Sequence, residues 1–474
     1  MSGVKKLSIA AHFVRARWRW QHLRGADLER YQEQRARLVM EYAREHAPFY
    51  RSHWFGHDLR DWRALPVVDK RLMMASFDTF NTRGIRREQA MEIALRAERE
   101  RDFRPQLAGL TIGLSSGTSG HRGLFLVSPR EQAAWAGTIL ARALHTLPRG
   151  TLRVAFFLRS NSNLYEQVGS TVIRFRYFDL MLPLAEAVVA LNDFQPHLIV
   201  GPPSLLGFLA REHQSGELRV RPQRLISVAE VLEQQEQRRI EAAFQAPVHQ
   251  IYQCTEGLLA VSCSRGSLHI QEDAVALQFE PLSAGKQAEQ QAAASALAGA
   301  ASAFTQKQNE RPEQKQDERV MPIVTDLWRT TQPIIRYRLN DVLQLAAQPC
   351  VCGSAFRVIR AIEGRCDDVC YFSSRAGGTR LFYPDTIRRM ILLASQEIAD
   401  YQVMQRQSGH LTVALTVAPG ASFASVSASV LSSIQATIAS YDCQPALVEI
   451  AEGIPSLVPG VKRRRVQRVD QGEG

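Results

Sequence analysis

Apolar residues recur at changing intervals along the chain, and these intervals predict its elements. Between residues 23 and 46 they follow a helical spacing among many charges, which predicts an amphipathic helix packed on a larger domain. Beyond residue 110, short apolar runs such as 152–158 and 225–228 alternate with longer helical patterns such as 230–244. Up to residue 257, this alternation is typical of an α/β domain with parallel strands.

A smaller set of elements follows residue 368. Three strand-like segments alternate with two helical patterns, at 369–372, 384–394, 411–417, 426–439 and 446–450. They predict a small α+β unit, so we expect a large domain over 1–366 and a smaller C-terminal domain over 367–474. Residues 283–319 are dominated by Gln, Ala, Glu and Lys without a sustained apolar face, which predicts a mobile surface insertion.

Composition narrows the class of protein. With 45% hydrophobic and 22% charged residues over 474 positions, the chain has the makeup of a soluble globular protein. Arginines and a histidine interrupt the apolar stretch that follows Lys5 and Lys6, so we expect neither a signal peptide nor a transmembrane segment, and a cytoplasmic location.

The net charge of +11 is concentrated in basic clusters at 15–24 and 462–465. Such clusters could meet nucleic acid or anionic lipid, but more often they are solvated faces. Without repeated aromatic and basic interleaving or zinc-finger spacing, the sequence predicts no nucleic-acid partner.

A loop rich in serine and glycine, SSGTSG at 115–120, follows the strand-like segment 110–114. Glycine lets the backbone approach an anion closely, and backbone N–H groups and hydroxyls can then surround phosphate oxygens. Many surface turns share this composition, and no Gly-Lys-Ser/Thr closes the loop as in a Walker motif.

Further motifs follow the loop in a fixed order, and together they resemble the adenylate-forming superfamily. Within it, the chain is similar to the phenylacetate-CoA ligase-like group, and the resemblance covers nearly all of the chain except the glutamine-rich insertion. The matching segments are LPVVDK at 65–70, SSGTSG at 115–120, VAE at 228–230, YQCTEG at 252–257, PIIRYRLND at 333–341, CVCG at 350–353 and IEGRCDD at 362–368. The fold implied is α/β, with a large N-terminal adenylate-forming domain and a smaller mobile α+β C-terminal domain.

The resemblance implies a set of ATP contacts. The phosphates would be held by Ser115, Ser116, Gly117, Thr118, Ser119 and Gly120. The adenine would be flanked by Ala229, Glu230 and Tyr252. Asp341 would accept hydrogen bonds from both ribose hydroxyls, which suits a carboxylate with two acceptor oxygens, and Arg365 would lie beside the ribose and phosphate.

The same resemblance implies the catalytic residues. Thr255 would bind the α-phosphate, and Glu256 would hold Mg²⁺, whose charge neutralises oxygens of the nucleotide. Lys462 would bridge the carboxylate and the α-phosphate, although a basic tail is the alternative for this residue. Adenylation is an in-line attack of a carboxylate on phosphorus, so it needs positioning and charge neutralisation rather than a nucleophilic side chain.

Three cysteines and a histidine form a second group. Two of the cysteines are separated by a single residue, and in a reducing compartment this spacing indicates metal ligation rather than a disulfide. The relatives have a similar pattern, which implies a structural, tetrahedral Zn²⁺ with no open position. Ordinary buried thiols are the alternative for this set, which comprises Cys263, His269, Cys350 and Cys352.

The predicted activity is therefore ATP-dependent conversion of a carboxylic acid to acyl-AMP, followed by transfer to a thiol. Coenzyme A and the phosphopantetheine of an acyl carrier protein are both possible acceptors. In the relatives the acyl pocket lies between the phosphate loop and the tyrosine motif. A polar segment lies there, and its residues would form the pocket wall and favour an aromatic or hydroxy-aromatic acid. An ordinary polar loop is the alternative for this segment, which includes Phe157, Asn161, Asn163, Tyr165 and Glu166.

Departures from the family pattern leave a second function open. Asn340 stands where glycine is usual, and Arg122 follows the phosphate loop where a lysine is common. The chain could thus be a non-catalytic nucleotide-binding protein that keeps the fold. Asp367 matches the family's hinge position, at the predicted domain boundary.

Overall fold

A computed structural model places most of the chain in two compact units. It describes residues 3–100, 105–115, 123–144, 150–158, 172–179, 184–281, 319–365, 368–377, 379–382, 384–392, 394–395, 397–455 and 464–469. One unit comprises Met1–Leu339 and Gln344–Ala361, and the other comprises Asn340–Leu343 and Ile362–Gly474. The predicted insertion at 283–319 and the hinge residue Asp367 lie outside the described residues, except for Arg319.

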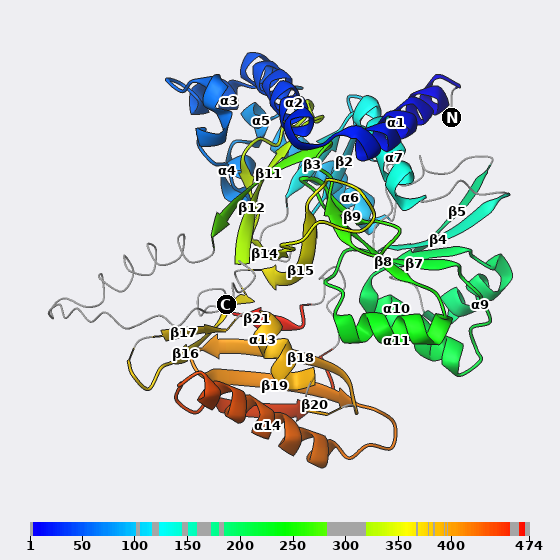
Figure 1. The fold of residues 1–474 in the computed structure, drawn as a ribbon, viewed down its shortest axis with the longest axis vertical. Coiled ribbons are helices and arrows are strands. Elements are labelled where there is room, and N and C mark those ends of the chain that lie inside the picture. Colours follow the sequence, from blue (N-terminus) through cyan, green and yellow to red (C-terminus); the bar gives the residue numbers. More distant parts are fainter. Residues whose placement is uncertain are drawn as a thin grey trace, which may run out of the picture. The chain divides into compact units, whose positions relative to one another are not determined.

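Helices form the N-terminal part of the large unit (Figure 1). They are α1 (Gly3–His22), α2 (Gly25–His46), α3 (Pro48–His53), the 3₁₀ helix η1 (Leu59–Ala64), α4 (Lys70–Ala75), α5 (Phe77–Phe80) and α6 (Arg87–Arg99). The helix predicted over 23–46 is confirmed as α2, and Gly25 at its start has a positive φ of 44°. Helix α1 was not predicted, because its Arg19 counts as polar in a pattern although it is buried in an ion pair with Asp273.

A large mixed sheet follows. Within the described residues it has 12 strands in the order β11-β12-β14-β15-β10-β9-β8-β7-β6-β4-β5, with β13 paired to β12. Strands β4 to β8 are parallel neighbours, formed by β4 (Leu152–Leu158), β5 (Ile173–Asp179), β6 (Leu198–Gly201), β7 (Arg224–Ser227) and β8 (Val248–Cys254). The other strands are β9 (Gly257–Ser262), β10 (Leu268–Ile270), β11 (Val275–Pro281), β12 (Arg319–Asp326), β13 (Tyr337–Arg338), β14 (Asp341–Leu345) and β15 (Val358–Arg365).

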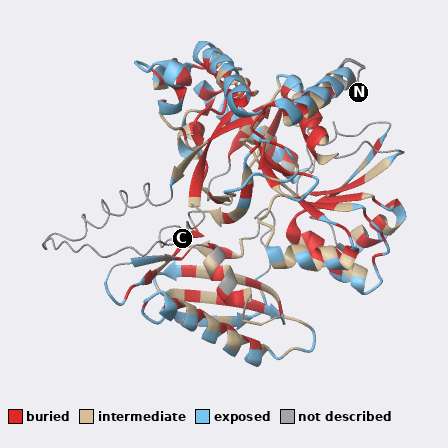
Figure 2. Ribbon diagram, viewed as in Figure 1, coloured by how far each residue is buried: buried red, intermediate tan, exposed pale blue. Residues whose placement is uncertain are grey.

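Three helices cross between the parallel strands, as the alternating pattern predicted. They are α9 (Leu184–Phe194), α10 (Pro203–Gln214) and α11 (Gln234–Phe244). Their apolar faces share one buried cluster with the sheet, in which Leu191, Leu206 and Ile240 are fully buried. In Figure 2 the parallel strands and parts of these helices are coloured as buried. The α/β fold class is confirmed.

The parallel domain begins later than the sequence predicted. Strands β1 (Gln106–Leu107), β2 (Leu110–Leu114) and β3 (Leu124–Val127) form a separate antiparallel sheet. The cause is the two-residue turn at Ala108 and Gly109, whose φ values of 51° and 75° are those of a tight hairpin. Helix α7 (Pro129–Ala143) follows β3, and a capping box between Ser128 and Glu131 starts it.

The C-terminal unit is a four-stranded sheet, ordered β20-β19-β18-β21, with a two-stranded sheet of β16 and β17. Its elements are β16 (Cys370–Ser373), β17 (Thr379–Phe382), α13 (Pro384–Leu392), β18 (Ile398–Gln407), β19 (His410–Val417), α14 (Phe423–Ser440), β20 (Leu447–Glu452) and β21 (Val466–Arg468). Among the described helices, α14 alone is long and apolar enough to span a membrane by length and composition. Its Val430, Ile434 and Ile438 are fully buried in the core of this unit.

Candidate functional site

The base of the serine- and glycine-rich loop is closed by a pair of hydrogen bonds between its two arms. The Ser115 N–H donates to the Gly123 carbonyl, and the Gly123 N–H donates to the Ser115 Oγ, each at 2.7 Å. A Cβ atom on Gly123 would lie 3.3 Å from the Lys70 Cε atom, so this lysine reaches the loop base. The other predicted phosphate-binding residues lie outside the described residues: Ser116, Gly117, Thr118, Ser119 and Gly120.

Thr255 and Glu256 form the tight turn between β8 and β9. The Thr255 hydroxyl donates to the Glu256 Oε2 atom at 2.9 Å, which holds the carboxylate beside the turn. Gly257 ends the turn, and a Cβ atom there would meet Val275 at 3.3 Å and the Asp326 Oδ2 atom at 3.4 Å. A residue without a side chain therefore lets Asp326 approach this turn closely.

Arg329 connects this turn to the strand that follows the serine-rich loop. Its Nη1 atom donates to the Thr255 carbonyl at 2.5 Å, and its Nη2 atom donates to the Leu126 carbonyl in β3 at 3.3 Å. Arg329 is only 8% exposed. The Arg329 guanidinium therefore binds both the Thr255 turn and β3, which are about 130 positions apart in the sequence.

Gln332 adds a second tie to β3. Its Oε1 atom accepts from the Leu126 N–H at 2.9 Å, and its Nε2 atom donates to the Leu124 carbonyl at 3.2 Å, so the side-chain amide binds the strand backbone. Glu131 holds the same segment from α7, since its Oε1 atom accepts from the Thr330 and Thr331 N–H groups. Although burial alone would raise the pKa of Glu131, these hydrogen bonds hold it below its usual value.

Two further buried groups shape the electrostatics of the turn. Burial raises the pKa of Asp326 to about 6, against the charge of Arg329 and two backbone N–H donors. Burial, and after it the charge of Glu256, raises the pKa of Tyr337, so its phenol stays protonated. The site therefore combines the Glu256 carboxylate of the turn with the buried guanidinium of Arg329 and the neutral phenol of Tyr337.

The predicted adenine-binding residues lie at the ends of parallel strands. Ala229 and Glu230 follow β7, and Ala229 has a left-handed φ of 69°. The Glu230 Oε2 atom accepts from the Ser204 N–H at the start of α10, at 3.4 Å. Tyr252 lies in β8, three residues before Thr255. The carboxyl edge of parallel strands is where nucleotides bind in open α/β sheets.

Three predicted residues belong to other parts of the chain. Asp341 begins β14 and Arg365 ends β15, in segments grouped with the C-terminal unit. Lys462 lies outside the described residues. The contacts around the Thr255 turn and the loop base therefore all belong to the large unit.

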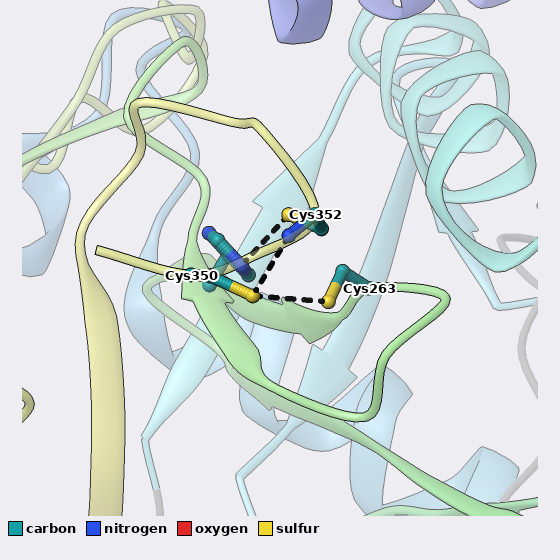
Figure 3. Close-up of side chains that lie close together, drawn as sticks. Cys263, Cys350 and Cys352 are labelled. Atoms are coloured by element: carbon teal, nitrogen blue, oxygen red, sulfur yellow. Dashed lines mark hydrogen bonds between the residues drawn. The ribbon is translucent and has the colours of Figure 1, made fainter. Parts of the chain in front are cut away.

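The predicted metal ligands come together. One ligand atom from each of Cys263, His269, Cys350 and Cys352 lies within 4.8 Å of the others. The Cys263 and Cys350 Sγ atoms are 3.8 Å apart, and the Cys352 Sγ atom is 3.4 Å from the His269 Nε2 atom. Figure 3 shows the three cysteine side chains converging.

The separations of 3.8 Å and 3.4 Å fit two edges of a tetrahedral zinc site. With Zn–S bonds of about 2.3 Å and a Zn–N bond of about 2.0 Å, the edges of the tetrahedron are about 3.8 Å and 3.5 Å. The His269 Nδ1 atom lies 2.8 Å from the Phe356 carbonyl, an arrangement that leaves Nε2 facing the cysteines as the ligand. Burial lowers the pKa of His269, which favours the neutral, ligating imidazole.

Comparison with known proteins rests on structure. No family model matches the chain, and no curated protein matches it significantly. A 2-hydroxyisobutyryl-CoA ligase in the postadenylation state, in complex with R3-HIB-AMP, superposes with a TM-score of 0.68 at 18% identity, covering 96% of this chain and 92% of that one. The same ligase with 2-HIB-AMP and CoA in the thioesterification state gives 0.55 at 19% identity, covering 96% and 92%. The acyl acid amido synthetase GH3.15 gives 0.58 at 11% identity, covering 90% and 87%.

The chain has the adenylate-forming fold. Three residues near the predicted site were given no role by the sequence prediction. Lys70 lay in a recognised motif but had no assigned role, whereas Arg329 and Gln332 lay in the polar segment between two strands. Their contacts with β3 and Thr255 are long-range in sequence, so only the structure brings them to the site.

Proposed function

We propose that this chain activates a carboxylic acid with ATP, forming acyl-AMP and pyrophosphate, and then transfers the acyl group to a thiol. The observation that supports it most is the Arg329 side chain, which binds both the Thr255 turn and the strand after the serine-rich loop. Phosphates held by the loop would thereby meet Thr255 and Glu256. The adenylate-forming fold and the nucleotide complexes of its structural neighbours support the same reaction.

The residues of the large unit suit the charge demands of adenylation. The Glu256 carboxylate, oriented by the Thr255 hydroxyl, fits a Mg²⁺ ligand, and this ion would supply neutralisation of phosphate oxygens. Lys70 would add a positive charge at the loop base, where the family's usual lysine after the loop is replaced by Arg122. Lys462 remains the proposed contact to the attacking carboxylate.

The acid and the acceptor are proposed on narrower grounds. The polar residues after Phe157 favour an aromatic or hydroxy-aromatic acid, whereas one neighbour carries a small hydroxy acid as its adenylate. That neighbour also binds CoA, which supports coenzyme A as the acceptor beside the phosphopantetheine of a carrier protein. The cysteine group would hold a structural zinc, and the cytoplasm is the proposed location because thiols stay reduced there.

The test is ATP–pyrophosphate exchange over a panel of aryl and hydroxy acids. Glu256→Gln should abolish acid-dependent exchange, because it removes a charge from the proposed magnesium site with little change in volume. Glu280→Gln is the matched control, since Glu280 pairs with Arg338 at the surface and should leave exchange unchanged. Nucleotide binding without exchange for any acid would instead support a non-catalytic nucleotide-binding protein.

A further inference from the structure

Helix α1 presents an apolar stripe to solvent. Three of its large apolar side chains are more than half exposed, with Leu7 at 72%, Val14 at 63% and Trp18 at 55%. At 100° per residue these three positions fall within about 40° of one another around the helix, along roughly 16 Å of its length. Ala10 and Ala11, also exposed, continue the stripe between them.

The opposite face of α1 is fixed to the large unit. Ile9 and Ala16 are buried there, and a Cβ atom on Gly137 of α7 would lie 2.5 Å from the His12 Cβ atom. The two helices therefore pack with almost no space between their backbones. Since α1 is held in this way, the outward direction of its stripe is set by the fold.

Positive charge borders the stripe on both sides. Arg15 and Arg17 lie at about 80° to either side of it by helical spacing. Arg15 is exposed, whereas Arg17 is half-buried and its Nη1 atom donates to the Leu144 carbonyl at 3.1 Å. Helix α1 contains no Asp or Glu. Burial, and after it Arg15, Arg19 and Arg130, lowers the pKa of His12, as expected where positive charges gather.

We infer that α1 docks the protein on an anionic lipid bilayer, with Leu7, Val14 and Trp18 in the interface and Arg15 at the headgroups. Apolar residues flanked by arginine, with an exposed tryptophan, are typical of helices that lie in a membrane interface. Charge complementarity selects this occupant, because cytoplasmic leaflets are negatively charged. A second copy of this chain would bring the arginines of two α1 helices together, and nucleic acid would leave the apolar stripe unused.

Co-sedimentation with vesicles tests this inference. The wild-type protein should bind vesicles of phosphatidylcholine mixed with phosphatidylglycerol, bind phosphatidylcholine alone weakly, and lose binding as salt rises. The double variant Val14→Gln, Trp18→Gln should lower the partition coefficient at least about tenfold, and Arg15→Glu should lower it as well. The matched control is Phe55→Gln, which removes another side chain that is 88% exposed in the same unit and should bind like wild type.

A second measurement needs no polar variant. Brominated lipid should quench tryptophan emission of the wild-type protein, and Trp18→Phe should remove that quenching. Equal binding to neutral and anionic vesicles, or equal loss in Phe55→Gln, would overturn the inference. So would light scattering that finds a wild-type dimer converted to a monomer by the stripe substitutions, because the stripe would then bind a second copy.

Discussion

Replacing Arg329 with methionine should separate catalysis from folding at the proposed site. The substitution keeps an unbranched side chain in a position that is only 8% exposed, but removes the donors to the Thr255, Leu126 and Gln332 oxygens. Two of these hydrogen bonds are long, at 3.3 Å, so most of the loss comes from the 2.5 Å bond to Thr255. A buried hydrogen bond to a charged group contributes about 1.5–3 kcal/mol, which sets the expected loss of stability.

The expected loss of rate is larger than this stability change alone would give. Without the Arg329 guanidinium, the Thr255 turn and β3 no longer share a hydrogen-bond donor. A displacement of about 1 Å in a catalytic site lowers the reaction rate about 10²-fold. We therefore expect pyrophosphate exchange to fall about 10²-fold in protein that is still folded. Exchange at saturating acid and ATP, with unfolding in urea measured on the same preparation, gives both quantities.

Arg35→Met is the matched control for this prediction. Arg35 binds the same segment, through the Leu327 carbonyl at 2.8 and 3.2 Å and the face of Trp328 at 4.1 Å, but none of its described contacts is with Thr255 or β3. It should lose about 1–3 kcal/mol of stability with little change in rate. Wild-type exchange in folded Arg329→Met protein, or an equal loss of rate in Arg35→Met, would refute the positioning role.

Three other outcomes are expected. Purified protein should hold about one zinc per chain, and Cys350→Ser with Cys352→Ser should remove both the metal and thermal stability, because a closed site contributes folding free energy; metal analysis without zinc would contradict this. Lys462→Ala should depress pyrophosphate exchange more than single-turnover transfer from supplied acyl-AMP, and equal losses in the two assays would contradict its role in adenylation. Asp326→Asn should change the pH dependence of stability, with a sign opposite to that of Asp273→Asn in urea titrations.

The sequence predicted well where the pattern was local. Strands β4 and β7 lie in short apolar runs, and three of the connections between parallel strands carry a helix, so the alternating pattern indicated the α/β class. The motif that contains Thr255 and Glu256 was recognised from six consecutive residues. The residue-by-residue roles within these motifs stay predictions.

What the sequence did not predict depends on partners distant in the chain. Arg19 looks like a surface residue until Asp273, 254 positions away, pairs with it inside the protein. The antiparallel sheet of β1 to β3 depends on positive φ at Ala108, which no periodicity reports. Arg329 acts through backbone carbonyls, and because every residue type has a carbonyl, such contacts leave no sequence motif.

Asp326 and Asp273 are both buried carboxyl groups, but their pKa values move in opposite directions, so the two can be compared as a pair. Burial raises the pKa of Asp326 to about 6 from an ordinary 3.8, so the folded state keeps this proton at pH values where the unfolded chain has lost it. The contribution of Asp326 to the free energy of unfolding therefore falls by about 3 kcal/mol in total as the pH rises from about 4 to 6. Asparagine keeps the oxygen that accepts from the Trp328 and Arg329 N–H groups without carrying charge. Relative to wild type, Asp326→Asn should thus gain stability across this range.

Asp273 should show the reverse. Despite its burial, Arg142 and Arg19 hold its pKa below the usual value, so the stability it contributes is present above about pH 4 and is lost as pH falls through its folded pKa. The loss of stability in Asp273→Asn relative to wild type should therefore be largest near neutral pH and should shrink in acid. The measurement is the free energy of unfolding in urea, from about pH 2 to 7 for Asp273→Asn and from about pH 4 to 7 for Asp326→Asn. If the Asp326→Asn and wild-type curves run parallel over that range, the carboxyl is charged throughout, and burial does not control its proton.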